Sequence, residues 1–296
     1  MQRRTFSLLD GLDMFLLDCE ARRLTPQTLT FYKQKLSVFV RWCEEQQLHG
    51  LDDLTARELR QFLVSIQRRG LSSQYQHNLA RAIRAFLNFC VRDELIDESP
   101  FDRVQMPRVE KKILQAFTAE QIQTVLHHCQ TERDRVICLF LLDSGVRASE
   151  LIAITVGDVN LNRGEVLVRA GKGQKQRTTY IGAITRKQLR RYLSGRDMYS
   201  QSPLFASENT GEPLTLSGVV QLMKRLSRRS GVDICTAHTF RRTFAINCLR
   251  NGMNIYALAR LMGHSDITVL RQYLALVDQD LQQAHQEFGA VDRMLG

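Results

Sequence analysis

Cationic and titratable side chains stand within an apolar helical pattern in residues 235–252, CTAHTFRRTFAINCLRNG. His238 and Arg241 are three positions apart, so a helix would place them on one face. Arginine stays charged and can make two parallel hydrogen bonds to a phosphate, while histidine titrates near neutral pH. Phe240 and Phe244 would anchor such a helix in a core. These residue types can bind an anion and move a proton.

Four further residues could join such a site. Arg147 follows Ser-Gly-Val near an expected helix start, and Lys172 lies in the loop GKGQKQR. His264 precedes Tyr273 by nine positions. Taken singly, each has an ordinary interpretation as a packing, structural or surface residue, so only their combination carries a functional argument.

Several other chemistries lack their sequence patterns. GKGQKQR departs from the phosphate-binding Walker pattern, and the chain has no HExxH, GxSxG or acidic metal cluster. The seven cysteines form no CxxC and are expected to be core thiols. His127 and His128 lack a partner at ligand spacing and are expected on a helix surface. We therefore expect no metal site and no cofactor.

The net charge of +10 favours a polyanionic partner such as nucleic acid. Basic residues gather in three runs, of which each by itself could be a solvated face. The runs span Arg57–Arg92, Arg169–Arg196 and Lys224–Arg250. Three separate runs of one sign make the nucleic-acid interpretation the stronger one.

A change in composition and in helical periodicity divides the chain. Residues 1–97 are expected to be all helix, residues 98–114 form a Pro-containing linker, and residues 115–296 form a larger domain. No apolar run is long enough to span a membrane, and early Asp residues interrupt any signal-peptide core, which predicts a cytoplasmic protein, nucleoid-associated in a bacterium.

Capping signals place the expected helices of the first domain. Thr25 is a predicted N-cap with Pro26 at the first helical position, and Thr55 with Glu58 forms a capping box ahead of a helix that ends at Gly70. An apolar stripe on a later helix consists of Leu79, Ile83, Phe86 and Cys90.

The second domain is expected to mix helices with a β-hairpin. Thr118 and Gln121 form another capping box, and helices are expected from about 185 and 215. Residues 166–169 and 178–181 are β-prone and flank the Gly/Lys-rich loop, which predicts a hairpin. The fold class is therefore mainly α with a small antiparallel sheet.

Four ordered segments together resemble the tyrosine recombinase (phage integrase) family. They are SGVRASEL, GKGQKQR, HTFRRTFA and LMGHSDITVLRQY, which match the family's arginine box, β-hairpin lysine loop, His-x-x-Arg box and Gly-His…Tyr box. LTPQTLTFYKQKLSVFVRW resembles part of its helical, SAM-like core-binding domain. The resemblance covers nearly the whole chain and is closest to short members of the Xer, transposon or integron type.

The resemblance implies a metal-free site built on a tyrosine nucleophile. Tyr273 would attack the scissile phosphate and form a 3′-phosphotyrosyl intermediate. Arg147, Arg241 and His264 would bind its oxygens, Lys172 would protonate the leaving 5′-oxygen, and His238 would exchange the tyrosine proton. Further basic residues are expected on the DNA backbone: Arg57, Arg81, Arg84, Lys175, Arg177 and Arg242. Arg242 stands where the family usually has His, and it could equally be a structural ion-pair partner.

The implied function is cutting and rejoining of double-stranded DNA at specific sites, by four protomers on two duplexes. The tail after Tyr273 could dock on a neighbouring protomer or pack on its own domain. A non-catalytic DNA-binding protein on the same fold and a type IB topoisomerase are the alternatives.

Overall fold

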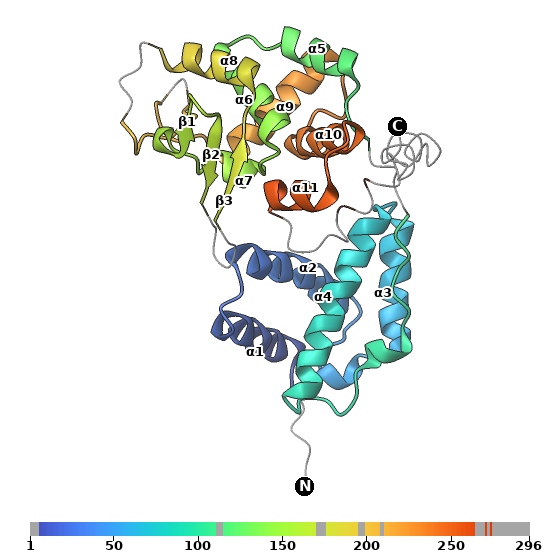
Figure 1. Ribbon diagram of the computed structural model, residues 1–296. Coiled ribbons are helices and arrows are strands. Elements are labelled where there is room, and N and C mark those ends of the chain that lie inside the picture. Colours follow the sequence, from blue (N-terminus) through green and yellow to red (C-terminus); the bar gives the residue numbers. More distant parts are fainter. Residues whose placement is uncertain are drawn as a thin grey trace, which may run out of the picture. The chain divides into compact units, whose positions relative to one another are not determined.

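The computed structural model describes residues 6–110, 115–169, 176–194, 199–207 and 210–263, together with residues 270 and 273. The chain divides into two compact units, Met1–Ile113 and Leu114–Gly296 (Figure 1). Helices dominate both units, and the second also holds a small antiparallel sheet. The predicted fold class is confirmed. None of the helices within these ranges is long and apolar enough to cross a membrane.

The first unit is a helical bundle around an aromatic core. The bundle centres on contacts between α2 and α4, with α1 and α3 packed against them. The predicted stripe on α4 is confirmed, because all four of its residues are buried. The elements are α1 (Leu8–Ala21), α2 (Pro26–Glu45), η1 (Leu51–Asp53), α3 (Ala56–Arg68), α4 (Ser73–Arg92) and η2 (Pro100–Arg103).

Local capping explains where the helices of this unit begin. The Thr25 hydroxyl accepts a hydrogen bond from a backbone N–H in the first turn of α2, and Pro26 occupies the first helical position. Thr55 caps α3 in the same way, and the Glu58 carboxylate accepts a hydrogen bond from the Thr55 hydroxyl. Gly70, just beyond α3, has a φ of +67°. The predicted N-caps Thr25 and Thr55 are confirmed.

Part of the segment expected to be a linker belongs to the core of the first unit. Phe101 and Val104 are buried among the bundle's apolar side chains. The short helix η2 that carries Phe101 packs against α3 and α4. The apolar pair is too short to show helical periodicity, which is why composition alone placed it in a linker.

The second unit surrounds helix α6, which packs against α8 and α10. Thr118 and Gln121 form the predicted capping box at the start of α5. The helices are α5 (Ala119–His127), α6 (Glu132–Ser144), α7 (Ala148–Leu151), η3 (Val156–Asp158), α8 (Ala183–Leu193), α9 (Leu216–Ser230), α10 (Ala237–Arg250) and α11 (Ile255–Met262).

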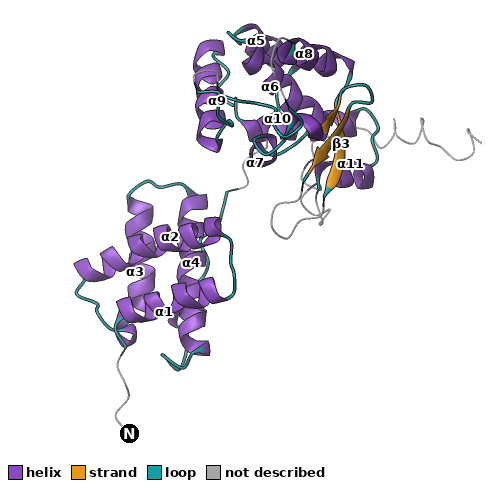
Figure 2. Ribbon diagram, turned by 90° about the vertical axis from the view of Figure 1, so that its left-hand side faces the viewer, coloured by secondary structure: helices purple, strands orange, loops and turns teal. Residues whose placement is uncertain are grey.

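The predicted hairpin is confirmed as the strands β2 (Glu165–Val168) and β3 (Arg177–Tyr180), which pair antiparallel. A further strand, β1 (Val159–Asn160), pairs with β2 and gives the order β1-β2-β3. It was not predicted, because two residues cannot show a β alternation. Helix α11 lies beside β3 (Figure 2).

Candidate active site

A sharp turn between α6 and α7 positions Arg147. Gly145 ends α6 in the left-handed conformation with a φ of +62°. A Cβ atom at this position would overlap the ring of Phe244 on α10, so the close approach of the two helices requires glycine. Val146 is buried, and Arg147 is the N-cap of α7 with its side chain 32% exposed.

Helix α10 carries Arg241 to the same turn. Its Nη1 donates to the carbonyl oxygen of Gly145 at 2.6 Å, and its Nη2 donates to that of Met262 at 2.8 Å. The residue is only 4% exposed. Burial, together with the nearby charge of Arg147, lowers the pKa of Arg241 to about 10, so the guanidinium stays charged at neutral pH. We call Arg147 and Arg241 the arginine pair.

The carboxylate of Glu150 stands beside the arginine pair. It accepts hydrogen bonds from the backbone N–H of Arg147 at 2.7 Å and from its Nη1 at 2.8 Å. Arg241 Nη1 lies 3.8 Å from Glu150 Oε2. Burial by itself would raise the pKa of Glu150, but hydrogen bonds from Arg177 and Arg147 outweigh burial and lower it to about 2.

The sequence interpretation missed Glu150. The signal was present, because Glu150 lies three positions after Arg147 in SGVRASEL, which is the spacing of a capping-box acid. A search for cations alone passes over it.

Arg177 differs from the expectation that it contacts the DNA backbone. Its side chain is only 10% exposed, and Nη1 and Nη2 donate to the two Glu150 oxygens at 2.9 and 2.7 Å. Arg177 therefore faces the arginine pair from the strand β3 instead of joining a basic surface. Its position in a run of like charges concealed this, since Glu150 is distant in the sequence.

His238 is exposed on the first turn of α10, three residues from Arg241. Partial burial of the ring, with the charges of Arg242 and Arg241, lowers the pKa of His238 below its usual 6.5. The imidazole is therefore neutral at pH 7 and can accept a proton.

Arg242 has a structural bond that bears on the open question of its role. Its Nη1 donates to the carbonyl oxygen of Gln115 at 2.7 Å, just before α5. The next residue, Thr243, accepts a hydrogen bond from the N–H of Phe117 at 2.9 Å. Arg242 thus helps to hold the chain ahead of α5 against α10, and it bonds a carbonyl group rather than an acid.

Tyr273 is 3% exposed and packs in an apolar cluster with residues of α10 and α11. The cluster includes Phe244, which also contacts the Gly145 turn. Arg241 lies near enough to Tyr273 to interact with it electrostatically. The structure thus brings Arg147, Arg241 and Tyr273 into one neighbourhood, with His238 on the same helix as Arg241.

The remaining predicted residues either lie outside the described residues or belong to the first unit. Lys172, Lys175 and His264 lie outside the described residues. Arg57, Arg81 and Arg84 are exposed in the first unit, as a surface role requires. The Arg81 guanidinium lies over the ring of Phe31, 4.8 Å from its centroid.

Comparison with known proteins identifies the family and the fold. Residues 115–280 match the phage integrase family, and residues 12–97 match the N-terminal SAM-like domain of phage integrases. The chain belongs to the phage integrase family. The resemblance inferred from the four segments is confirmed. As a member, the protein is an enzyme of the tyrosine recombinase type, which transfers DNA strands.

Several relatives of this family member span most of its length. It is 29% identical over 283 residues to tyrosine recombinase XerA of Thermococcus kodakarensis, covering 95% of both chains. Its fold is similar to that of the Tn1549 transposon integrase in complex with a circular intermediate DNA, with a TM-score of 0.76, 20% identity, and 96% and 99% of the chains covered. A lambda integrase dimer bound to a core site gives a TM-score of 0.77 at 18% identity, with 91% and 77% covered.

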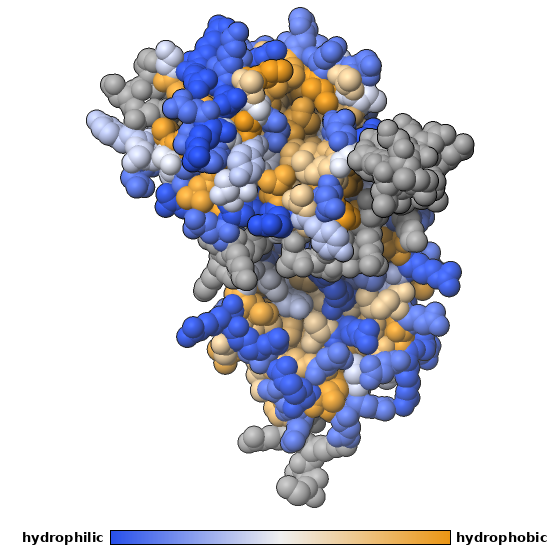
Figure 3. Space-filling view, viewed as in Figure 1, coloured by the Kyte–Doolittle hydropathy of each residue, from blue (hydrophilic) through white to orange (hydrophobic). Residues whose placement is uncertain are grey.

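The basic runs of this integrase-family chain divide by what their side chains do. Strongly hydrophilic residues gather around α8 (Figure 3), but several of its arginines bond protein atoms. Arg186 and Arg190 donate to the carbonyl oxygens of Asn162 and Leu161, and Arg191 pairs with Glu132. The exposed α9 cations Lys224, Arg228 and Arg229 make no hydrogen bond or ion pair with any residue in the described ranges.

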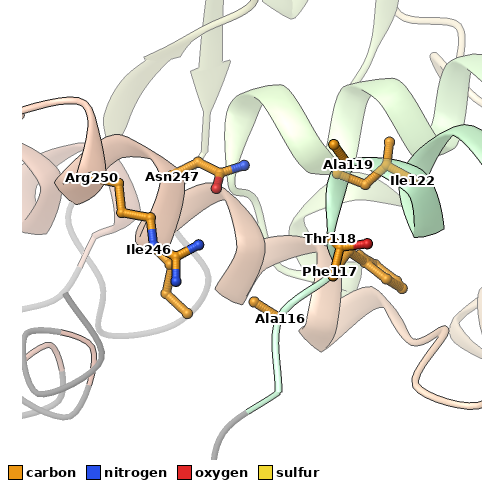
Figure 4. A pocket seen from close by; sticks show the side chains of 8 residues that line it. All are labelled: Ala116, Phe117, Thr118, Ala119, Ile122, Ile246, Asn247 and Arg250. Atoms are coloured by element: carbon orange, nitrogen blue, oxygen red, sulfur yellow. The ribbon is translucent and has the colours of Figure 1, made fainter. Parts of the chain in front are cut away.

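A pocket of about 500 Å³ lies beside α10 (Figure 4). It is lined by the segment entering α5 and by the α10 residues Ile246, Asn247 and Arg250. None of the predicted catalytic residues within the described ranges lines it. The pocket is therefore separate from the chemistry described above.

Proposed function

We propose that this protein is a site-specific DNA recombinase in which Tyr273 is the nucleophile. The observation that carries the proposal is the convergence of Arg147 and Arg241 on Glu150, with Tyr273 near enough to Arg241 to interact with it electrostatically. Phosphoryl transfer accumulates negative charge on the non-bridging oxygens, and fixed guanidinium groups stabilise that charge without reorganisation. Losing one such donor typically slows catalysis by about 100-fold or more.

The cleavage step exchanges one phosphodiester for another. The Tyr273 oxygen forms a bond to phosphorus, the bond to the 5′-oxygen breaks, and a 3′-phosphotyrosyl linkage remains. The tyrosine proton passes to His238, whose neutral imidazole can accept it. Lys172 donates a proton to the leaving 5′-oxygen. A 5′-hydroxyl from another strand then reverses the step and rejoins the DNA.

Burial of Tyr273 has a consequence for this reaction. Its side chain is nearly inaccessible, packed against α10 and α11. A phosphate bound by the arginine pair must touch the tyrosine hydroxyl for in-line attack. We infer that DNA binding is accompanied by a rearrangement around Tyr273 that uncovers the hydroxyl.

Double-stranded DNA with a specific recombination site is the proposed substrate. Exposed cations on the first unit, Arg57, Arg81 and Arg84, and on α9 supply phosphate contacts that give affinity and salt dependence. Arg242 is proposed as a residue that tunes His238, because its charge lowers the histidine pKa. We propose a synapse of four protomers on two duplexes, with the tail after Tyr273 joining neighbours.

Two experiments separate this function from its alternatives. A nicked suicide duplex labelled on either side of the scissile phosphate should yield a covalent adduct that retains only the label on the 5′ side, because that segment ends in the 3′-phosphotyrosyl linkage. An absence of adduct under any condition would favour a non-catalytic DNA-binding protein. Strand exchange should then require two sites on the DNA, whereas relaxation of supercoiled DNA that bears a single site would favour a topoisomerase.

A further inference from the structure

Arg177 joins three parts of the second unit that carry proposed catalytic residues. It is the first residue of β3, the strand that follows the loop containing Lys172. Its Nη1 and Nη2 bond the two oxygens of Glu150 on α7, and its Nε donates to the carbonyl oxygen of Leu261 on α11 at 2.8 Å. A guanidinium with all three nitrogens engaged and little exposure is fixed in position.

The hydrogen bonds around Glu150 show the effect of the Arg177 side chain on this carboxylate. An ionised carboxylate has about four acceptor sites. Arg177 supplies two donors and Arg147 supplies two, one from its backbone and one from its side chain. Arg241 Nη1 remains 3.8 Å from Glu150 Oε2, beyond hydrogen-bond distance. Arg177 thus completes the acceptor set of Glu150 and leaves Arg241 at the longer distance.

The turn after α11 packs directly on the Arg177 guanidinium. Gly263 has a φ of +66°, and a Cβ there would lie 2.9 Å from Arg177 Nη1. This turn immediately precedes His264 in the sequence. The same side chain therefore supports the α7 carboxylate and the turn that ends α11.

We infer that Arg177 is a positioning residue for DNA cleavage, which keeps Glu150 from neutralising the arginine pair. The inference rests on the proposed function. Without the bidentate bond from Arg177, two acceptor sites of Glu150 would be free to accept hydrogen bonds from Arg147 and Arg241. The positive charge of the arginine pair would then be neutralised by the Glu150 carboxylate. The pair would bind the scissile phosphate more weakly and stabilise the transition state less.

The test measures how much the scissile phosphate contributes to DNA binding. Two duplexes are compared in the Tyr273→Phe background, identical except that one lacks the phosphate at the scissile position. The dissociation constant of the duplex without the phosphate, divided by that of the intact duplex, reports the contacts that the protein makes to the scissile phosphate, including those of the arginine pair. A merely structural defect lowers the active fraction of protein equally for both duplexes and leaves the ratio unchanged.

Arg177→Lys keeps the charge but cannot form the bidentate bond. We expect Arg177→Lys to reduce the ratio by roughly tenfold. In protein that retains Tyr273, it should slow adduct formation by a similar factor. The double variant Arg177→Lys, Glu150→Gln should recover part of the ratio, because the competing carboxylate charge is gone. If Arg177→Lys melts below the assay temperature, Arg177→Gln is measured in its place.

Arg169→Lys is the matched control, since Arg169 follows β2 and pairs with Asp158 at 2.8 Å without touching Glu150. Its ratio should equal that of the parent protein. A parent ratio well above one that is unchanged in Arg177→Lys would overturn the inference and leave the proposed function intact. A parent ratio of one would show that the arginine pair does not bind the phosphate, and both would fail.

Discussion

The guanidinium of Arg241 donates to the carbonyl oxygen of Gly145 at 2.6 Å and so ties α10 to the turn that presents Arg147. This bond joins the two elements that carry the arginines and so couples their positions. Preorganisation of this kind lets fixed charges stabilise a transition state. A change at Gly145 should therefore affect both the stability of the fold and the rate of DNA cleavage.

Replacing Gly145 with alanine should destabilise the protein by about 3 kcal/mol and slow DNA cleavage. The positive φ accounts for about 1 kcal/mol, and the overlap of the new methyl group with the Phe244 ring accounts for the rest. Urea unfolding measures the stability. Gly231→Ala is the control, since Gly231 ends α9 with a φ of +70° but has no atom near its Cβ position. Equal losses in the two variants would show that the Phe244 contact is unimportant.

Glu150 should stabilise the fold in a pH-dependent way. Its pKa is about 2 in the folded protein, below the ordinary value of 4.5, so the folded state favours the ionised form. The stabilisation is present above pH 4.5 and is lost as the pH falls toward 2. Glu150→Gln should therefore lower the free energy of unfolding by about 3 kcal/mol at pH 7. A difference between parent and variant that stays constant from pH 7 to pH 3 would be inconsistent with this coupling.

The charge of Arg242 should hold down the pKa of His238. Partial burial is the larger cause of the lowered value, and Arg242 is the next. Arg242→Gln should shift the His238 titration upward toward 6.5, as followed by the NMR signal of the imidazole. Arg250→Gln, at the far end of the same helix, should leave the midpoint unchanged. An unchanged midpoint in Arg242→Gln would remove the tuning role from Arg242.

The α9 cations should carry more of the DNA affinity than the α8 arginines. Lys224 is exposed and makes no hydrogen bond or ion pair within the described ranges, whereas Arg190 donates to the Leu161 carbonyl oxygen at 2.7 Å. Lys224→Gln should reduce the slope of log affinity against log salt concentration by about one. Arg190→Gln should change it little. The reverse order would place the phosphate contacts on α8.

Local patterns predicted most of the fold because their causes are local. Thr25, Thr118 and Gln121 cap helices through bonds within one turn, and the hairpin follows from two β-prone stretches around a loop. Phe101 in the first unit's core and the two-residue strand β1 were missed, since neither has a period.

The site shows the same division between local and long-range signals. His238 and Arg241 were placed correctly on one helix by their spacing. The pairing of Arg177 with Glu150 joins residues 27 positions apart, so no short pattern predicts it. Arg177 belongs to a run of basic residues in the sequence, and its role follows only from its bonds to Glu150 and to the carbonyl oxygen of Leu261.

The most direct test of the account is to trap the wild-type protein on a nicked suicide duplex and map the adduct by mass spectrometry. The account predicts one modified peptide, in which Tyr273 carries the 3′-phosphoryl end of the DNA. Tyr273→Phe should form no adduct while it binds the duplex with unchanged affinity. An adduct on another residue, or one that persists in Tyr273→Phe, would contradict the assignment of the nucleophile.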